Sequence, residues 1–218
     1  MTYSGTVRVG GPADVHELTD LMISKVAVGP MNNNAYLLRC RATGEQLLID
    51  AAAEAGILLR LIGADGIASV VTTHRHPDHW QALGEVVAAT GARTYAGRYD
   101  AKGIPVPTDE LVKDGGTVRV GRVPLTARHL TGHTPGSVAL VYDDPHGAPH
   151  VFTGDCLFPG GLGKTRNDPE AFASLFHDVE TKLFDRLPDE TWVYPGHGHD
   201  TTLGAERPHL PEWRERGW

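Results

Sequence analysis

The 218-residue sequence is poor in cysteine, contains no long apolar run and has no excess of positive charge. Its two cysteines, Cys40 and Cys156, form no Cys-x-x-Cys pair, which excludes a disulfide framework and a four-cysteine zinc site. No apolar segment approaches the roughly 20 residues that a membrane helix needs. The formal net charge of -7 argues against general binding of nucleic acids or anionic membranes, which requires a basic face.

The N-terminal segment lacks the charged region and apolar stretch of a signal peptide, so we expect a cytoplasmic protein. A chain of 218 residues with 40% hydrophobic residues can bury a core without disulfides. We see no linker or repeat and therefore expect one domain that spans residues 1–218. The composition does not indicate an oligomeric state.

Apolar periodicity predicts a mixture of strands and helices. Strands are expected at residues 23–28, 35–41, 46–50, 67–73, 93–96, 117–120, 123–130, 137–142, 150–153 and 191–194. Helices are expected at 53–61 and 80–90. The clearest helix starts at Asp168-Pro169, an N-cap followed by proline, and its apolar stripe runs to Leu187. The tail from 203 to 218 should form one or two helical turns and then become irregular. This mixture predicts an α/β fold in which helices cover sheets.

The densest group of candidate metal ligands is the run Thr73-His74-Arg75-His76-Pro77-Asp78-His79. It places three imidazoles and one carboxylate within six residues, directly after a β-like run. Imidazole suits zinc, iron or copper, and carboxylate suits harder ions. This segment therefore predicts a site for divalent metals at the end of a strand.

Three later positions match this run in chemistry. His133, Asp155 and His197 each lie near the end of an expected strand and beside glycine, where the backbone can approach a metal closely. A lone histidine is usually a surface or hydrogen-bonded residue, and we interpret His16, His146, His150 and His209 in that way. The sequence does not decide whether His129, His177 and His199 belong to the site or to the surface.

In their order, the motifs Thr-His-x-His-x-Asp-His, Gly-His-Thr-Pro-Gly-Ser, Phe-Thr-Gly-Asp and Pro-Gly-His resemble the metallo-β-lactamase fold superfamily. The resemblance extends from about residue 23 to 207. It implies an αββα sandwich of two mixed β-sheets flanked by helices, with two divalent metal ions at one edge. Zinc is the expected metal, and iron or manganese also suits these ligands. The implied ligands are His74, His76 and His133 for the first ion, Asp78, His79 and His197 for the second, and Asp155 as the bridge.

The segment from Gly154 to Lys164 is similar to glyoxalase II, the hydroxyacylglutathione hydrolases, in which the basic residue touches the thiol cofactor. Arg166 and His199 stand where that family has aromatic residues, and the sequence stops at Trp218, where the family continues into a helical extension. We therefore expect a shorter glyoxalase II-like hydrolase that uses a thiol other than glutathione. Lys164, Arg166 and His199 are the expected substrate-binding residues.

The implied reaction is hydrolysis of a small acyl thioester by a hydroxide that bridges the two ions beside Asp155. Asp78 would take or relay a proton, and the thiolate leaves without a strong general acid. Three alternatives remain open at this point. These are a lactonase with nearly the same ligands, a persulfide dioxygenase with one iron on His74, His133 and Asp155, and a non-catalytic metal-binding module. The substrate is a small thioester or ester in the hydrolase interpretations, with no nucleic-acid or membrane partner.

Overall fold

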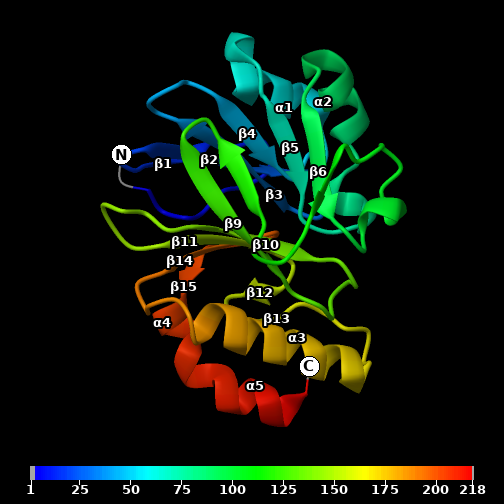
Figure 1. The fold of residues 1–218 in the computed structure, drawn as a ribbon, viewed down its shortest axis with the longest axis vertical. Coiled ribbons are helices and arrows are strands. Elements are labelled where there is room, and N and C mark those ends of the chain that lie inside the picture. Colours follow the sequence, from blue (N-terminus) through cyan, green and yellow to red (C-terminus); the bar gives the residue numbers. More distant parts are fainter. Residues whose placement is uncertain (1–2, 218) are drawn as a thin grey trace.

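Three clusters of buried apolar side chains divide the structure into four layers. The computed structural model describes residues 3–217. One cluster lies between two β-sheets, a second between the first sheet and its helices, and a third between the second sheet and its helices. Figure 1 shows the resulting order of helix, sheet, sheet and helix from top to bottom. The αββα sandwich expected from the sequence is confirmed.

The first sheet has seven strands in chain order, and two helices cover its outer face (Figure 1). Its strands are β1 (Asp14–Glu17), β2 (Leu21–Val28), β3 (Asn33–Cys40), β4 (Gln46–Ile49), β5 (Ser69–Thr72), β6 (Arg93–Gly97) and β7 (Glu110–Val112). The covering helices are α1 (Ala55–Ile62) and α2 (Leu83–Thr90), and short 3-10 turns form η1 (Gly63–Asp65), η2 (Pro77–His79) and η3 (Ala101–Gly103). Apolar residues on both faces of β2 to β5 explain why these segments read as continuous hydrophobic runs.

The second sheet has six strands in the order β15-β14-β11-β10-β9-β8. These are β8 (Thr117–Val120), β9 (Val123–His129), β10 (Val138–Tyr142), β11 (His150–Gly154), β14 (Trp192–Pro195) and β15 (Thr201–Thr202). A separate hairpin is formed by β12 (Leu157–Phe158) and β13 (Gly161–Leu162). The helical elements of this half are α3 (Pro169–Val179), the π-helical turn η4 (Glu180–Phe184), α4 (Leu203–Glu206), η5 (Arg207–His209) and α5 (Leu210–Arg216).

Parallel pairing brings the ends of several strands to one edge of the sandwich. Strand β4 is parallel to β5 and β5 to β6, while β11 is parallel to β14 in the other sheet. Backbone hydrogen bonds join the two sheets at this edge: Val138 N donates to Thr73 O over 2.9 Å, and Asn34 N donates to Gly196 O over 2.7 Å. The loops that follow β5, β11 and β14 therefore meet.

The longer expected elements are present, and the differences lie at their ends. The Asp168 carboxylate caps α3 by accepting hydrogen bonds from two backbone amides, as predicted. Helix α2 starts at Leu83 instead of residue 80, because residues 77–79 form the turn η2 and the Trp80 indole donates to Arg75 O.

The C-terminal tail is helical as far as Arg216, so the expectation of an irregular end was wrong. Trp218 lies outside the described residues. Burial of Trp213 against the second sheet's helices stabilises this tail.

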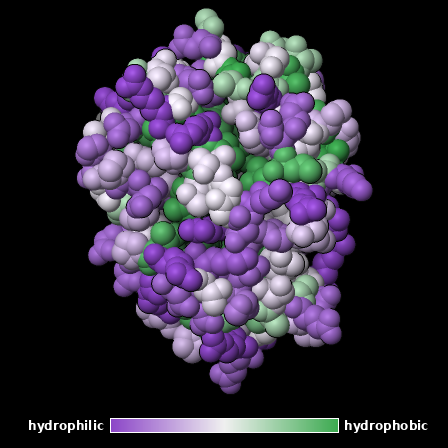
Figure 2. Space-filling view, in the orientation of Figure 1, coloured by the Kyte–Doolittle hydropathy of each residue, from purple (hydrophilic) through white to green (hydrophobic). Residues whose placement is uncertain are grey.

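Large apolar side chains are exposed at scattered positions. Val9, Met31, Tyr99 and Leu111 are the exposed ones among the described residues. The face in Figure 2 is largely hydrophilic, and hydrophobic side chains show mainly in narrow strips between polar ones. Scattered apolar residues of this kind are normal on a protein surface. None of the helices in residues 3–217 is long and apolar enough to span a bilayer.

Two of the four histidines that we interpreted as surface or hydrogen-bonded residues, His16 and His150, share one tyrosine hydroxyl. His16 Nδ1 lies 2.8 Å and His150 Nδ1 lies 3.0 Å from Tyr194 Oη. His150 is buried, with 4% of its surface exposed. Burial, together with the nearby His16, lowers the pKa of His150 to about 4, although Asp144 acts in the opposite direction. His150 is therefore held in its neutral form in the folded protein.

We predict that His150 makes folding stability depend on pH between about pH 6.5 and pH 4. The unfolded chain binds a proton at this histidine in that range and the folded chain does not, so stability is full above pH 6.5 and falls as the pH is lowered. The loss should reach about 3 kcal/mol. Urea unfolding with excess chelator at several pH values measures the slope, and His150→Asn should reduce it. The exposed His177→Asn is the control, and equal slopes in the wild type and His150→Asn would contradict the prediction.

Candidate metal centre

Seven side chains from four loops converge at the edge where the sheets are joined. His74, His76, Asp78 and His79 follow β5, and His133 lies in the loop between β9 and β10. Asp155 follows β11, and His197 follows β14. Their ligand atoms form three groups whose members lie within 4.8 Å of one another: His74 with His76 and His133, His74 with His79 and Asp155, and Asp78 with His79 and His197.

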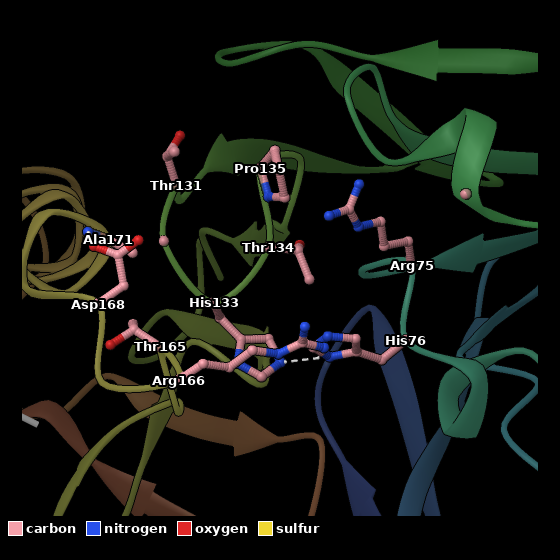
Figure 3. A pocket seen from close by; sticks show the side chains of 12 residues that line it. Arg75, His76, Thr131, His133, Thr134, Pro135, Thr165, Arg166, Asp168 and Ala171 are labelled. Atoms are coloured by element: carbon pink, nitrogen blue, oxygen red, sulfur yellow. Dashed lines mark hydrogen bonds between the residues drawn. The ribbon is translucent and has the colours of Figure 1, made fainter.

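The first group consists of three imidazoles whose nitrogens face one another. His133 Nε2 lies 2.9 Å from His76 Nδ1 and 3.3 Å from His74 Nε2. Figure 3 shows the rings of His133 and His76 meeting from separate loops. Three facing nitrogens cannot all be satisfied by hydrogen bonds among themselves, because a neutral imidazole has one donor and one acceptor. A cation that accepts their lone pairs would satisfy all three.

The second group combines a carboxylate with two imidazoles. Asp78 Oδ2 lies 3.3 Å from His197 Nε2 and 3.5 Å from His79 Nε2. The buried amide of Asn33 donates to the same oxygen over 2.9 Å. Asn33, which the sequence analysis did not identify, therefore fixes the orientation of Asp78.

Asp155 lies between the two groups. Its Oδ2 is 3.6 Å from His133 Nε2 and 3.5 Å from His197 Nε2, and its Oδ1 is 3.4 Å from His79 Nε2. Oδ1 is buried and has no hydrogen-bond partner among the residues that the structure describes. A buried carboxylate oxygen without a partner is costly unless a cation binds it. The carboxylate thus fits the role of a ligand shared by both groups.

The outward nitrogen of each of these imidazoles has a partner that sets its tautomer. His133 Nδ1 lies 2.9 Å from Lys164 O, and His197 Nδ1 lies 3.0 Å from Met31 O. His79 Nδ1 lies 2.7 Å from Asp50 Oδ2. When these Nδ1 atoms carry the proton, each Nε2 faces inward as a lone-pair donor, as in metal sites where an outer partner orients the ligand.

The pKa shifts of His74, His133 and Asp155 agree with ligation. Burial lowers the pKa of His74 well below its usual value, and it also lowers the pKa of His133. Burial raises the pKa of Asp155, but the neighbouring imidazoles of His197 and His79 outweigh it and hold that pKa well below the usual range. Neutral imidazoles and ionised carboxylates are the forms that bind metals. The donor set therefore fits one or two divalent metal ions.

For His79, burial lowers the pKa, but Asp50 and Asp155 outweigh burial and raise it to about 10, and Asp155 likewise raises the pKa of His197. A metal ion would therefore displace a proton from each of these two rings.

Two buried aspartates outside the ligand set hold the loops together. Asp50 accepts hydrogen bonds from Thr73 N over 2.7 Å and Thr73 Oγ1 over 2.8 Å, in addition to its contact with His79. Asp100 accepts from Arg75 N over 3.0 Å and Gly136 N over 2.9 Å, which links the loop after β5 to the loop of His133. The sequence analysis missed both, and a carboxylate directly after the strand at 46–49 was the available signal for Asp50.

Two glycines permit the close approach of the loops. A Cβ atom on Gly163 would lie 1.7 Å from Asp155 O, and one on Gly196 would lie 2.2 Å from Asp155 Oδ1. Any side chain at either position would displace Asp155. This explains the glycine that precedes His197 in the sequence.

Two pockets border the centre and share the segment from Thr165 to Arg166. One has a volume of about 770 Å³ and includes Arg75, His76, His133 and Arg166 (Figure 3). The other has a volume of about 510 Å³ and includes Phe158, Lys164 and Arg166. His199 is exposed and its Nδ1 lies 3.1 Å from Thr6 Oγ1, so it faces the N-terminal segment and lines neither pocket. Cys156 is buried in the core, and burial raises the pKa of its thiol.

The sequence profile described as Metallo-beta-lactamase superfamily matches residues 28–197. Together with the αββα fold and the convergent histidines and aspartates, this match shows that the chain belongs to the metallo-β-lactamase superfamily. The superfamily consists mostly of hydrolases and binds divalent metal ions, and the family expected from the sequence motifs is thus confirmed.

Three proteins that are similar to this chain show which members of the superfamily it resembles. The chain is 36% identical to a hydroxyacylglutathione hydrolase of Fuscovulum blasticum over 77% of its own length, and the match spans 63% of that relative. It is similar to the structure of TTHA1623 in a di-iron-bound form, with 35% identity, a TM-score of 0.70, and coverage of 84% of this chain and 96% of that one. It is also similar to the BLEG-1 B3 metallo-beta-lactamase, with 26% identity, a TM-score of 0.75, and coverage of 88% and 99%.

The structure thus brings all seven predicted ligands together, while the assignment of each to a particular ion stays a prediction. The substrate-binding roles predicted for Lys164, Arg166 and His199 also stay predictions. The metal itself is not identified by the geometry, because imidazole and carboxylate together accept zinc, iron and manganese.

We predict that Asp50→Asn weakens metal binding by the group of Asp78, His79 and His197 by about 10- to 100-fold. Asparagine keeps the size of the side chain and tolerates the left-handed backbone at this position, where φ is 59°. It removes the charge that orients His79. Elemental analysis after dialysis against a buffered, limiting metal concentration should show fewer ions per chain than in the wild type. Asp144→Asn, a buried aspartate outside the centre, is the control, and an undiminished metal content in Asp50→Asn would contradict the prediction.

Proposed function

We propose that the protein is a metal-dependent hydrolase that cleaves a small acyl thioester, as glyoxalase II-like enzymes do. The observation that supports this most directly is the position of Asp155, whose two oxygens lie within 3.6 Å of nitrogens from both ligand groups. A carboxylate shared in this way suits two neighbouring ions. In this proposal His74, His76 and His133 would hold one ion, Asp78, His79 and His197 would hold the other, and Asp155 would serve as a ligand to both.

Bound divalent ions would supply a Lewis acid for the substrate carbonyl and a water molecule whose pKa lies near neutrality. Asp78 is placed to accept or relay a proton at Oδ2, where the Asn33 amide holds it. Burial of His74 and His79 excludes bulk water from the inner side of the centre. A thiolate is a good leaving group, so the reaction does not require a strong general acid from this chain.

The relatives named hydroxyacylglutathione hydrolase favour a thioester as the substrate. Lys164 supports the same proposal, because it lines the pocket of about 510 Å³ beside Phe158. A cationic lysine in a partly apolar pocket suits the acidic or polar end of a thiol carrier. We propose a carrier other than glutathione, because Arg166 occupies the position of an aromatic residue in glyoxalase II.

A persulfide dioxygenase is the second candidate. One iron on His74, His133 and Asp155 would suffice for it, and Asp155 Oδ2 lies 4.0 Å from His74 Nε2 and 3.6 Å from His133 Nε2. The second group of Asp78, His79 and His197 has no part in that reaction. Its close assembly favours the hydrolase.

We predict about two metal ions per chain and hydrolysis of small acyl thioesters that stops on chelation and returns when metal is restored. Metal analysis of the purified protein checks the first part. Parallel assays with acyl thioesters, a homoserine lactone and a chromogenic β-lactam check the second, and oxygen consumption with glutathione persulfide tests the dioxygenase. A single tightly bound iron with oxygen consumption would replace the proposal with the dioxygenase. Turnover of the lactone alone would replace it with a lactonase.

We predict that Lys164→Ala raises KM for a thioester with an acidic thiol by about 5- to 30-fold, the effect of losing one charge-assisted contact. The change in kcat should be small, because Lys164 reaches the carrier and not the reacting carbonyl. Steady-state kinetics measure both constants. Lys102→Ala, an exposed lysine outside both pockets, is the control, and an unchanged KM in Lys164→Ala would mean that Lys164 is a solvated loop residue.

A further inference from the structure

The pocket of about 770 Å³ beside His76 and His133 carries two arginines, Arg75 and Arg166, that have no part in the proposed reaction steps. Arg75 approaches from the loop after β5, and Arg166 approaches from the loop before α3 (Figure 3). The hydroxyl-bearing Thr131, Thr134 and Thr165 also line this pocket. A concave site with cations next to the metal ligands can take an acidic group of the substrate.

Arg166 is held in an unfavourable backbone conformation that aims it into the pocket. Its φ is 57° and that of the following Asn167 is 60°, and both lie in the left-handed region that favours glycine. Figure 3 shows its side chain projecting toward the imidazoles of His133 and His76. The fold must therefore hold this conformation in place, and such departures concentrate at functional sites.

The charges around the pocket leave Arg166 available for a ligand. No described residue gives its guanidinium a hydrogen bond or an ion pair, and its side chain is exposed. Asp168 lines the same pocket and its Oδ1 accepts from Glu170 N and Ala171 N at the start of α3, and among the described residues no ion pair joins its carboxylate to Arg166. Arg75 Nε lies 3.8 Å from the carboxylate of the buried Asp100. Arg75 is therefore a second cation in the pocket, and Asp100 compensates part of its charge.

We propose that this pocket binds an acyl group that ends in a carboxylate, with Arg166 as the residue that determines this specificity. The proposal rests on the thioester hydrolase function proposed above. Arg166 lines both pockets, and the acyl side is assigned to the one of about 770 Å³ because Lys164 lines only the neighbouring pocket, where the thiol carrier would lie. Planar guanidinium groups match carboxylates through paired hydrogen bonds.

The test compares two thioesters of the neutral thiol N-acetylcysteamine. The succinyl thioester carries a terminal carboxylate, and the 4-methylpentanoyl thioester replaces it with an uncharged isopropyl group of similar shape. The wild-type holoenzyme should prefer the succinyl thioester by about 10- to 100-fold in kcat/KM, as one charge-assisted contact provides. Arg166→Met should abolish most of this preference, Arg166→Lys should retain part of it, and Arg75→Met should reduce it less than Arg166→Met does.

Arg119→Met removes an exposed arginine on β8, away from the pocket, and should leave the preference unchanged. A third substrate places the carboxylate on the thiol instead, as the 4-methylpentanoyl thioester of 3-mercaptopropionate. An Arg166-dependent preference for this substrate and not for the succinyl thioester would overturn the acyl assignment. Equal preference in the wild type and Arg166→Met would overturn the role of Arg166.

A binding measurement separates this proposal from the proposed reaction. Succinamate and 4-methylpentanamide are unreactive analogues of the two acyl groups, and titration calorimetry with the holoenzyme measures both. Tighter binding of succinamate that is lost in Arg166→Met would support the pocket even if no thioester were hydrolysed. Thioester hydrolysis without any Arg166-dependent binding or preference would retain the reaction and refute the pocket.

Discussion

The buried carboxylate of Asp50 is the contact on which the metal centre depends. Asp50 follows β4 and has a left-handed backbone conformation. Its carboxylate accepts hydrogen bonds from both the backbone amide and the side-chain hydroxyl of Thr73. Through the same group it orients His79. Since a buried carboxylate is stable only when its oxygens are satisfied, these contacts fix the start of the ligand loop relative to the neighbouring strand. Asp100 joins this loop to the loop of His133 by accepting backbone hydrogen bonds from both.

These two aspartates explain how one edge of the sandwich can hold five imidazoles and two ligand carboxylates. The loops come from both sheets, and each would be mobile if it were anchored only by its own strand. Backbone hydrogen bonds between the sheets and the side-chain contacts of Asp50, Asp100 and Asn33 remove that freedom. The outer face of the centre is different in character. Arg166 and Lys164 are exposed there and lie in a short loop, so these two side chains can vary without disturbing the candidate ligands beneath them.

Several elements could not be predicted from the sequence. The edge strands β1 and β7 and the two-residue strands of β12, β13 and β15 are too short to show an alternating pattern, and they exist because a neighbouring strand offers hydrogen bonds. Helix α2 begins later than its apolar pattern indicates, because the ligand loop uses residues 77–79 as a tight turn. The C-terminal helix α5 forms because Trp213 is buried against the core of the second sheet, a contact that local propensity does not contain.

The sequence by itself determined the family, the α/β class and the seven candidate ligands, because these depend on local order: ligands near the end of a strand in each of four motifs, with a glycine beside the ligand in three of them. Only the tertiary structure decided how those motifs meet, which nitrogen of each imidazole faces inward, and that Asp155 lies between two groups. It also separated Arg166, which lines the pocket, from His199, which contacts Thr6. The physical reason is that the orientation of a side chain is fixed by partners distant in sequence, such as Lys164 O for His133 and Met31 O for His197.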